Sequence, residues 1–200
     1  MTDLDARKAV LRGKLKERRA AAAAANGAAV AALAADRFLA AVPLRAGQAV
    51  AGYWPMADEL DPRPLLDALR QCGVLVLLPC VVAKAQPLAF RRWDEDVAPP
   101  PGRYGIPAPP DHLPALRPDI LLVPLVGFDA EGHRLGMGGG FYDATLEALR
   151  GDGLPLLAAG YAFAVQQVAE LPHGAMDERL DLVVTERGAI DCHAEGGQTI

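Results

Sequence analysis

A glycine-rich stretch in the second half of the chain combines residue types that suit an anion. Gly136 and the run of glycines at residues 138–140 lie between Arg134 and Asp143. Glycines let backbone N–H groups approach a ligand closely, and an arginine beside them adds a cation. An acid just after them could hold a cation in turn. This combination is typical of a site for phosphate.

The residues around the glycines predict the elements that position them. Residues 120–126 form an apolar run that is too short to cross a membrane and is typical of a buried strand. Leu146 and Leu149 recur at helical spacing, so a helix should start directly after the glycines, with Asp143 in its first turn. Helix N-termini offer unpaired N–H donors and a dipole that favours anions.

Other interpretations of this stretch remain. A plain loop would also use glycines for its turns, and Asp143 would then only favour the helix dipole. The motif is not a Walker loop, because no Gly-Lys-Ser/Thr follows, and the dinucleotide fingerprint would need glycine at Phe141. We favour phosphate binding, because the glycines stand between an arginine and an acid at a strand-to-helix junction.

Length and composition indicate one soluble globular domain spanning residues 1–200. The chain has 200 residues, of which 52% are hydrophobic and 22% charged. A net charge of −5 disfavours general nucleic-acid binding. Residues 1–19 are basic on this acidic body, which suggests a local anion site, although a solvated face is the commoner meaning of such a run.

Cysteine usage and the N-terminal residues bear on the compartment. Cys72, Cys80 and Cys192 show neither metal-ligand spacing nor an even framework for disulfides, which fits a reducing compartment. Residues 1–19 contain no apolar run of a signal peptide. We expect a cytoplasmic monomer that contacts no membrane. The chain has no serine, which excludes a serine nucleophile.

Two helices are predicted at the start of the chain, at about 3–24 and 28–41, separated by Asn26-Gly27. Leu4, Leu11 and Leu15 share one face of the first helix; Lys8 falls within that stripe and Arg12 borders it. These cations either pack their stems and extend their charged ends to water, or they reach a buried phosphate or carboxylate. The helix alone does not decide between the two.

The remaining pattern predicts a three-layer α/β/α domain with a mostly parallel sheet. Strands are expected at 48–53, 74–82, 87–93, 120–126, 156–161 and 182–185, and a further helix at 63–72. The strand at 87–93 alternates and suits an edge or antiparallel position. The proline-rich segment 94–118 either covers a site or returns the chain across the sheet, and we favour the second. Ligands of such sheets bind at the carboxyl ends of the strands, where the loops after Tyr53, Val126 and Tyr161 would meet.

Two further groups of residues could contribute chemistry. The strand end at Tyr53 delivers Trp54 and Glu59, an aromatic face and a carboxylate that suit a planar heterocycle, although a core edge with a solvated acid is at least as compatible. Asp177 and Asp181 precede the last predicted strand, and one of them could join Asp143 at a Mg²⁺ ion. Turn and strand-entry roles are the commoner explanation for such acids.

Together these pieces resemble a known family. Residues 134–143, RLGMGGGFYD, look like the signature of 5-formyltetrahydrofolate cyclo-ligases, also called methenyltetrahydrofolate synthetases. Lys8-x-x-x-Arg12, the stretch from Tyr53 to Glu59, Asp177 and the LDLVVTE segment also match, in the right order. The resemblance implies the α/β/α fold shared with ribose-phosphate isomerase and CoA-transferase-like domains. It also implies ATP-dependent conversion of 5-formyltetrahydrofolate to 5,10-methenyltetrahydrofolate, with release of ADP and phosphate.

The resemblance further implies a set of site residues, with Arg134 as the catalytic cation. Those expected at ATP are Lys8, Arg12, Arg134, Leu135, Gly136, Met137, Gly138, Gly139, Gly140, Phe141 and Tyr142. Those expected at the folate are Trp54, Glu59, Met137, Gly138, Gly139, Gly140 and Phe141, and those at Mg²⁺ are Asp143 and Asp177. The chain departs from the family pattern at Met137, Phe141 and Met176, which affects details of folate and metal contact.

The implied chemistry needs no protein nucleophile. The formyl oxygen is a poor leaving group, and phosphorylation by ATP turns it into phosphate, so that N10 can close the ring. Phosphoryl transfer depends on positioning and charge neutralisation, which cations and loop N–H groups supply. The alternatives are a sugar-phosphate isomerase-like enzyme of the same fold, which would ignore ATP, and a non-catalytic nucleotide-binding module.

Overall fold

The protein is built around one twisted sheet, which the computed structural model describes together with its helices for residues 2–95, 97–194 and 198–199. In the described part of the chain the sheet has eight strands, in the order β10-β9-β8-β7-β4-β1-β2-β3. The strands are β1 (Ala49–Ala51), β2 (Leu75–Cys80), β3 (Ala89–Arg92), β4 (Ile120–Val123), β7 (Leu157–Tyr161), β8 (Leu182–Thr185), β9 (Gly188–Asp191) and β10 (Gln198–Thr199).

The centre of the sheet is parallel and its edges are antiparallel. Strand β1 pairs in parallel with β2 and β4, and β4-β7-β8 continue in the same direction. Strand β3 pairs antiparallel with β2, and β9 and β10 extend the other edge antiparallel. This confirms the mostly parallel sheet and the edge position predicted for residues 87–93. Strands β9 and β10 were not predicted.

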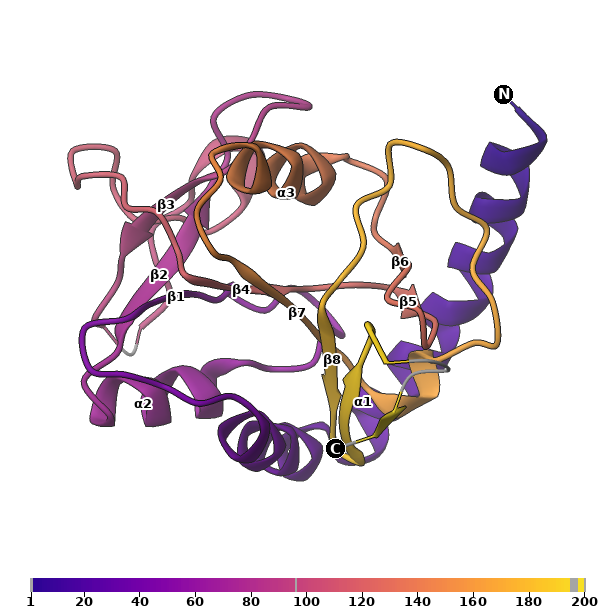
Figure 1. The fold of residues 1–200 in the computed structure, drawn as a ribbon, viewed down its shortest axis with the longest axis horizontal. Helices are drawn as coiled ribbons and strands as arrows, with labels where there is room; N and C mark the ends of the chain where they lie inside the picture. The colour runs from indigo at the N-terminus through magenta and orange to yellow at the C-terminus, as the bar shows by residue number, and fades with distance from the viewer. Residues whose placement is uncertain (1, 96, 195–197, 200) are drawn as a thin grey trace.

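Helices cover both faces of the sheet, which makes three layers (Figure 1). Helix α2 (Arg63–Gln71) and the second half of α1 (Asp3–Ala41) pack on one face, where Phe38 and Leu65 are fully buried. Helix α3 (Phe141–Gly151) lies on the opposite face, where Leu146 is buried against the sheet residue Leu121. The predicted three-layer α/β/α class is therefore confirmed.

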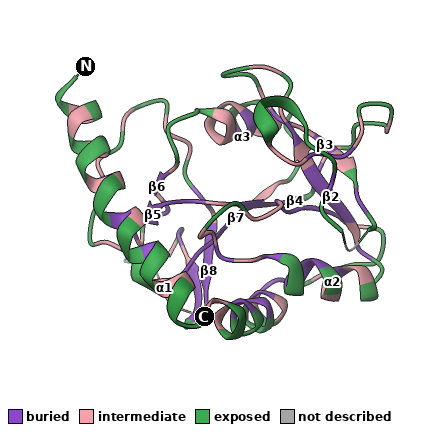
Figure 2. Ribbon diagram, turned by 180° about the vertical axis from the view of Figure 1, so that it is seen from behind, coloured by how far each residue is buried: buried purple, intermediate pink, exposed green. Residues whose placement is uncertain are grey.

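Helix α1 consists of two helical halves that meet at a kink at Asn26, whose φ of −165° and ψ of 38° are not helical. The predicted helix end at Asn26-Gly27 is therefore a kink between two helical halves. The first half runs along one end of the molecule with its outer side exposed, while the second half turns under the sheet (Figure 2). This places the basic N-terminal residues at the edge where the glycine-rich stretch lies.

The glycine-rich stretch contains a small hairpin that the sequence did not predict. Strands β5 (Gly127–Phe128) and β6 (Arg134–Leu135) pair antiparallel, so Arg134 lies in a strand and not in an open loop. Leu15 of α1 packs so closely on the hairpin that a Cβ at Gly127 would lie 2.3 Å from its Cδ1. The absence of a side chain at Gly127 therefore allows the first half of α1 to pack against the hairpin.

Two short 3₁₀ turns complete the described structure, η1 (Arg103–Gly105) in the proline-rich segment and η2 (Ala164–Gln166) after β7. In the residues that the structure describes, no helix has both the length and the apolar character needed to span a bilayer.

Candidate functional site

A cleft of about 480 Å³ opens at the carboxyl ends of β1, β2 and β4. Helix α1, the loop after β1, the hairpin, the glycine loop and the loop before β8 all contribute to its wall. The site residues that the family resemblance implies all line this one cleft: Lys8, Arg12, Trp54, Glu59, Arg134, Leu135, Gly136, Met137, Gly138, Gly139, Gly140, Phe141, Tyr142, Asp143 and Asp177. The chain thus brings together segments up to 169 residues apart.

The glycine loop forms the exposed rim of the cleft. Gly138 has φ of +97° and Gly140, at the N-cap of α3, has φ of +69°, conformations that other residues adopt only with strain. No side chain caps the first turn of α3 at Gly140. The loop therefore presents backbone groups and an uncapped helix start to the cleft, as an anion site requires. Met137 at the rim is 59% exposed.

Arg134 is buried and paired with an acid of the same motif. Its side chain is 4% exposed and donates from Nη2 to Asp143 Oδ1 across 2.7 Å. It also donates to the Glu178 carbonyl oxygen. Asp143 Oδ1 accepts a second hydrogen bond from the Glu178 backbone N–H at 3.1 Å. The sequence predicted a cation beside the glycines, and the structure places Arg134 in β6, where it pairs with Asp143 in the first turn of α3.

The two cations of α1 also reach into the cleft. Lys8 pairs with the Asp177 carboxylate, and Arg12 donates from Nε to the Gly136 carbonyl oxygen at 2.8 Å. Burial alone would raise the pKa of Asp177, but hydrogen bonds from Lys8 and the Gly174 N–H outweigh it, so the pKa lies below its ordinary value. Of the two alternatives that the sequence left open for Lys8, the structure therefore shows contact with a carboxylate and not extension of the charged end into water.

The candidate metal ligands are Asp143 and Asp177, and Asp181 is not one of them. Asp143 and Asp177 both line the cleft, with 34% and 24% of their side chains exposed. Asp181 accepts the Ala158 backbone N–H at 2.7 Å and contacts Arg150 at 3.2 Å, outside the cleft lining. The strand-entry explanation therefore applies to Asp181.

The opposite wall of the cleft carries an aromatic ring and a buried acid. Glu59 is 13% exposed, and its Oε2 accepts the Met56 backbone N–H at 3.0 Å. Burial raises the pKa of Glu59, while that hydrogen bond and Arg19 oppose the rise. Burial also raises the pKa of the Tyr142 hydroxyl; Glu59 adds to the rise and Arg134 opposes it. The pKa of the Tyr142 hydroxyl therefore depends on charged residues of both walls of the cleft.

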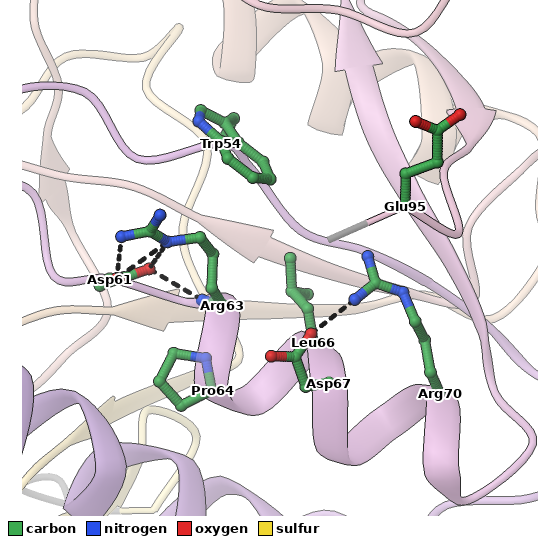
Figure 3. A pocket seen from close by; sticks show the side chains of 8 residues that line it. All are labelled: Trp54, Asp61, Arg63, Pro64, Leu66, Asp67, Arg70 and Glu95. Atoms are coloured by element: carbon green, nitrogen blue, oxygen red, sulfur yellow. Dashed lines mark hydrogen bonds and ion pairs between the residues drawn. The ribbon is translucent and has the colours of Figure 1, made fainter. Parts of the chain in front are cut away.

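A second hollow, of about 280 Å³, lies on the far side of Trp54 (Figure 3). Arg63 lies over the Trp54 ring at 5.5 Å from its centroid and pairs with Asp61 at 2.6 Å. Arg70 pairs with Asp67, also at 2.6 Å. Arg63 and Arg70 line this hollow together with three acids, Asp61, Asp67 and Glu95. Its net charge is therefore negative and disfavours a phosphate. The chemistry of the motifs belongs to the larger cleft.

Another group of possible metal ligands, Asp129, Glu131 and His133, lies apart from the cleft wall. Asp129 is fully buried, and its carboxylate accepts the backbone N–H groups of His133 and Leu171 at 2.9 and 3.0 Å. These bonds close the β5–β6 hairpin and tie it to the loop before β8. The group has a structural use without an ion.

Sequence reasoning missed two contributors to this region. Arg19 of α1 is 4% exposed and pairs with Asp58 at 2.8 Å, directly beneath the loop that carries Glu59. Its spacing of four residues from Leu15 extends the apolar stripe of the first helix, and that signal could have identified it. Ile106 and Pro107 of the proline-rich segment also line the cleft, so this segment does cover part of a site.

Comparisons with known proteins agree on one family. A family model described as the 5-formyltetrahydrofolate cyclo-ligase family matches residues 5–186. The 5-formyltetrahydrofolate cyclo-ligase of Escherichia coli (strain K12) is 37% identical over 157 residues, which cover 76% of this chain and 85% of that protein. The protein of the same name from Haemophilus influenzae is 35% identical over 133 residues, covering 64% and 70%.

Solved structures give the same result. The NMR structure of Aquifex aeolicus 5,10-methenyltetrahydrofolate synthetase superimposes with a TM-score of 0.76 and 25% identity, covering 96% of this chain and 95% of that one. A 5,10-methenyltetrahydrofolate synthetase from Mycoplasma pneumoniae superimposes with a TM-score of 0.70 at 21% identity, covering 90% and 98%. The second likeness shows the fold alone.

Proposed function

The chain belongs to the 5-formyltetrahydrofolate cyclo-ligase family, and from this premise we propose how its cleft divides between the two substrates. The enzyme converts 5-formyltetrahydrofolate to 5,10-methenyltetrahydrofolate, with ATP as co-substrate. The observation that carries the proposal is that one cleft gathers the cations, the glycine loop, the acids and the aromatic wall.

We assign the half of the cleft next to α1 to the phosphates of ATP. Lys8, Arg12 and Arg134 supply positive charge there, and the loop at residues 136–140 supplies backbone groups beside the N-terminus of α3. Phosphates favour both kinds of partner. Lys8 and Arg134 are each paired with an acid, so a bound phosphate would take over cations that are already held in place.

Asp143 and Asp177 fit a Mg²⁺ ion that accompanies ATP. Mg²⁺ takes one or two protein carboxylates and completes its shell with phosphate oxygens and water, and these two acids line the same cleft beside the phosphate cations. The ion would neutralise charge on the transferring phosphate. The two acids would hold it, while Arg134 and Lys8 would turn from the acids toward the phosphate.

We assign the wall of Trp54 and Glu59 to the folate. The indole offers a flat apolar face to a pterin ring, and a buried carboxylate can accept hydrogen bonds from N–H groups on the edge of that ring. We assign Tyr142, which lines the cleft and whose pKa responds to both Glu59 and Arg134, to the junction of the two halves.

The residues then support a two-step reaction without a protein nucleophile. The formyl oxygen attacks the γ-phosphorus, and ADP leaves. N10 then attacks the activated formyl carbon, the phosphate takes away the carbon–oxygen bonding pair, and loss of the N10 proton leaves the methenyl bridge. Arg134 and Lys8 stabilise the negative charge that develops during transfer, which is the largest contribution a site of this type makes.

The direct test mixes the protein with ATP, Mg²⁺ and 5-formyltetrahydrofolate and follows the absorbance of the methenyl product together with ADP. One ADP per product is expected, because phosphorylation consumes ATP stoichiometrically. Product formed without ATP would contradict the phosphorylation mechanism. Binding of ATP without folate turnover would instead favour a nucleotide-binding module.

A further inference from the structure

Arg19 lies behind the folate wall of the cleft and not in its lining. Its guanidinium grips Asp58 in a bidentate manner, with Nη2 to Oδ1 at 2.8 Å and Nε to Oδ2 at 3.2 Å. The remaining nitrogen, Nη1, donates to the Leu125 carbonyl oxygen at 3.3 Å and lies 3.9 Å from Glu59 Oε1. One buried cation thus joins helix α1, the loop after β1 and the segment after β4.

The loop held by Arg19 contains a short turn with an unusual backbone conformation. It closes on itself through the Met56 N–H to Glu59 Oε2, at 3.0 Å, and the Glu59 N–H to the Met56 carbonyl oxygen, at 3.1 Å. Ala57 between them has a φ of +49°, a left-handed conformation unusual for alanine. A strained turn of this kind persists only where its surroundings hold it. The ion pair between Arg19 and Asp58 ties the turn to helix α1. The end of the turn is anchored by Leu60, which is buried and accepts a hydrogen bond from the Tyr53 hydroxyl at 2.6 Å.

The carbonyl group of Leu125, in the segment after β4, is the second partner of Arg19. The Leu125 carbonyl oxygen that receives Arg19 also accepts a hydrogen bond from Gln166 Nε2 at 2.8 Å, and Gln166 is 1% exposed. Leu125 itself lines the cleft. Arg19 therefore also contacts the segment after β4, at a carbonyl that Gln166 holds in place.

We infer that Arg19 is a positioning residue for the folate half of the cleft, holding the loop after β1 so that Glu59 faces the substrate as a charged carboxylate. This inference rests on the proposed folate role of Glu59 and adds to it a residue that touches neither substrate. Arg19 acts through geometry, by its bidentate hold on Asp58, and through charge, by its distance of 3.9 Å from Glu59.

The charge effect has a defined sign. Besides Arg19 on α1, the titratable groups that face Glu59 are Asp58 beside it, Tyr53 at the end of β1 and Tyr142 on α3, with Arg134 behind Tyr142. Burial and Asp58 raise the pKa of Glu59, and Arg19 lowers it. Removing Arg19 should raise that pKa further, and removing the charge of Asp58 should lower it. The two changes therefore displace the pH dependence of folate binding in opposite directions.

The experiment measures the affinities for 5-formyltetrahydrofolate and for ATP separately by titration calorimetry between pH 5 and 8. Arg19→Met should weaken folate binding about tenfold or more and move its acid limb to higher pH, with ATP affinity within about twofold of the parent. Asp58→Asn should move the acid limb to lower pH. Arg19→Lys keeps the charge without the bidentate grip, so its acid limb should stay close to the parent while folate affinity falls.

Arg18→Met is the matched control, because Arg18 is the exposed neighbour of Arg19 on α1. It should leave both affinities and the acid limb unchanged. An equal loss of ATP and folate affinity in Arg19→Met, or shifts of the acid limb in the same direction for Arg19→Met and Asp58→Asn, would overturn the inference. If Arg19→Met does not fold, Arg19→Lys and Asp58→Asn still decide it. Failure of the parent protein to turn over folate would instead contradict the proposed function.

Discussion

The guanidinium of Arg134 donates to the carboxylate of Asp143 across 2.7 Å, so the cation assigned to the phosphate and the acid assigned to the metal are partners of each other. Lys8 and Asp177 repeat the arrangement in the same cleft. In each pair the cation is assigned to the phosphates of ATP and the acid to the Mg²⁺ ion. Mg²⁺ and ATP together can replace both partnerships at once, whereas either one alone would leave an unpaired charge.

Asp143→Asn tests the metal assignment. The amide keeps a hydrogen-bond acceptor for Arg134 but removes the charge that a Mg²⁺ ion needs. We expect kcat to fall roughly 100-fold or more, the loss typical of removing one electrostatic contact to a transition state, and the Mg²⁺ requirement to rise. Stability should fall by about 1–3 kcal/mol, because buried Arg134 loses its charged partner. Turnover is measured across a Mg²⁺ series and stability by urea unfolding; parent-like turnover at limiting Mg²⁺ would mean the metal binds elsewhere.

Glu59→Gln tests the folate wall. The change keeps shape and removes charge, so folate affinity should fall about tenfold or more while ATP affinity stays close to the parent. Burial raises the pKa of Glu59 from an ordinary value of 4.5, so the parent should lose folate affinity on acidification at a pH above that value. That acid limb should be missing from Glu59→Gln. Calorimetry at several pH values measures both effects, and a variant that lost ATP binding but kept folate binding would reverse the assignment.

Much of the fold was predictable, because its signals are local. Apolar runs marked the parallel strands, and Asn26-Gly27 marked the break in α1. The β5–β6 hairpin was missed because each of its strands has two residues, too few for any periodicity to register. Strand β9 was missed for a related reason: its four residues follow β8 through a turn of two.

The residues of the site also had local signals in the sequence, but the contacts between them did not. The glycine loop, Lys8 and Arg12 could be found from residue type and spacing. The partners of those cations could not, since Lys8 and Asp177 are separated by 169 residues and meet only when the loop before β8 folds against α1. Arg19 had a signal in its helical spacing, but only the folded chain reveals that Asp58 lies opposite it.

Gly138→Ala tests whether the conformation of the glycine loop matters for ATP. An added Cβ would meet only Arg12 atoms at 3.8 Å, an ordinary contact, so the cost comes from the φ of +97° and should be about 1–3 kcal/mol of local strain. The loop should relax away from its binding shape, with a loss of ATP affinity of about tenfold. Gly13→Ala is the control: Gly13 is exposed within α1 with open space around it, and alanine there should stabilise the protein by about 0.5–1 kcal/mol. ATP affinity at parental level in Gly138→Ala would show that the loop tolerates other shapes.

Lys8→Met separates the structural and binding roles of the α1 cation. The pair with Asp177 is partly buried, with side chains 17% and 24% exposed, and should contribute about 1 kcal/mol to stability at neutral pH. The folded-state pKa of Asp177 lies below its ordinary value of 3.8, so this contribution is present above that value and is lost as the pH falls through the folded pKa. Urea unfolding of parent and variant should therefore differ at pH 7 and converge only as the pH falls below 3.8. ATP affinity should fall about tenfold at pH 7, because a phosphate partner is gone. Lys14→Met, a change at an exposed lysine of the same helix, should alter neither quantity. If Lys8→Met lost stability but bound ATP as the parent does, Lys8 would serve only to tether the loop of Asp177.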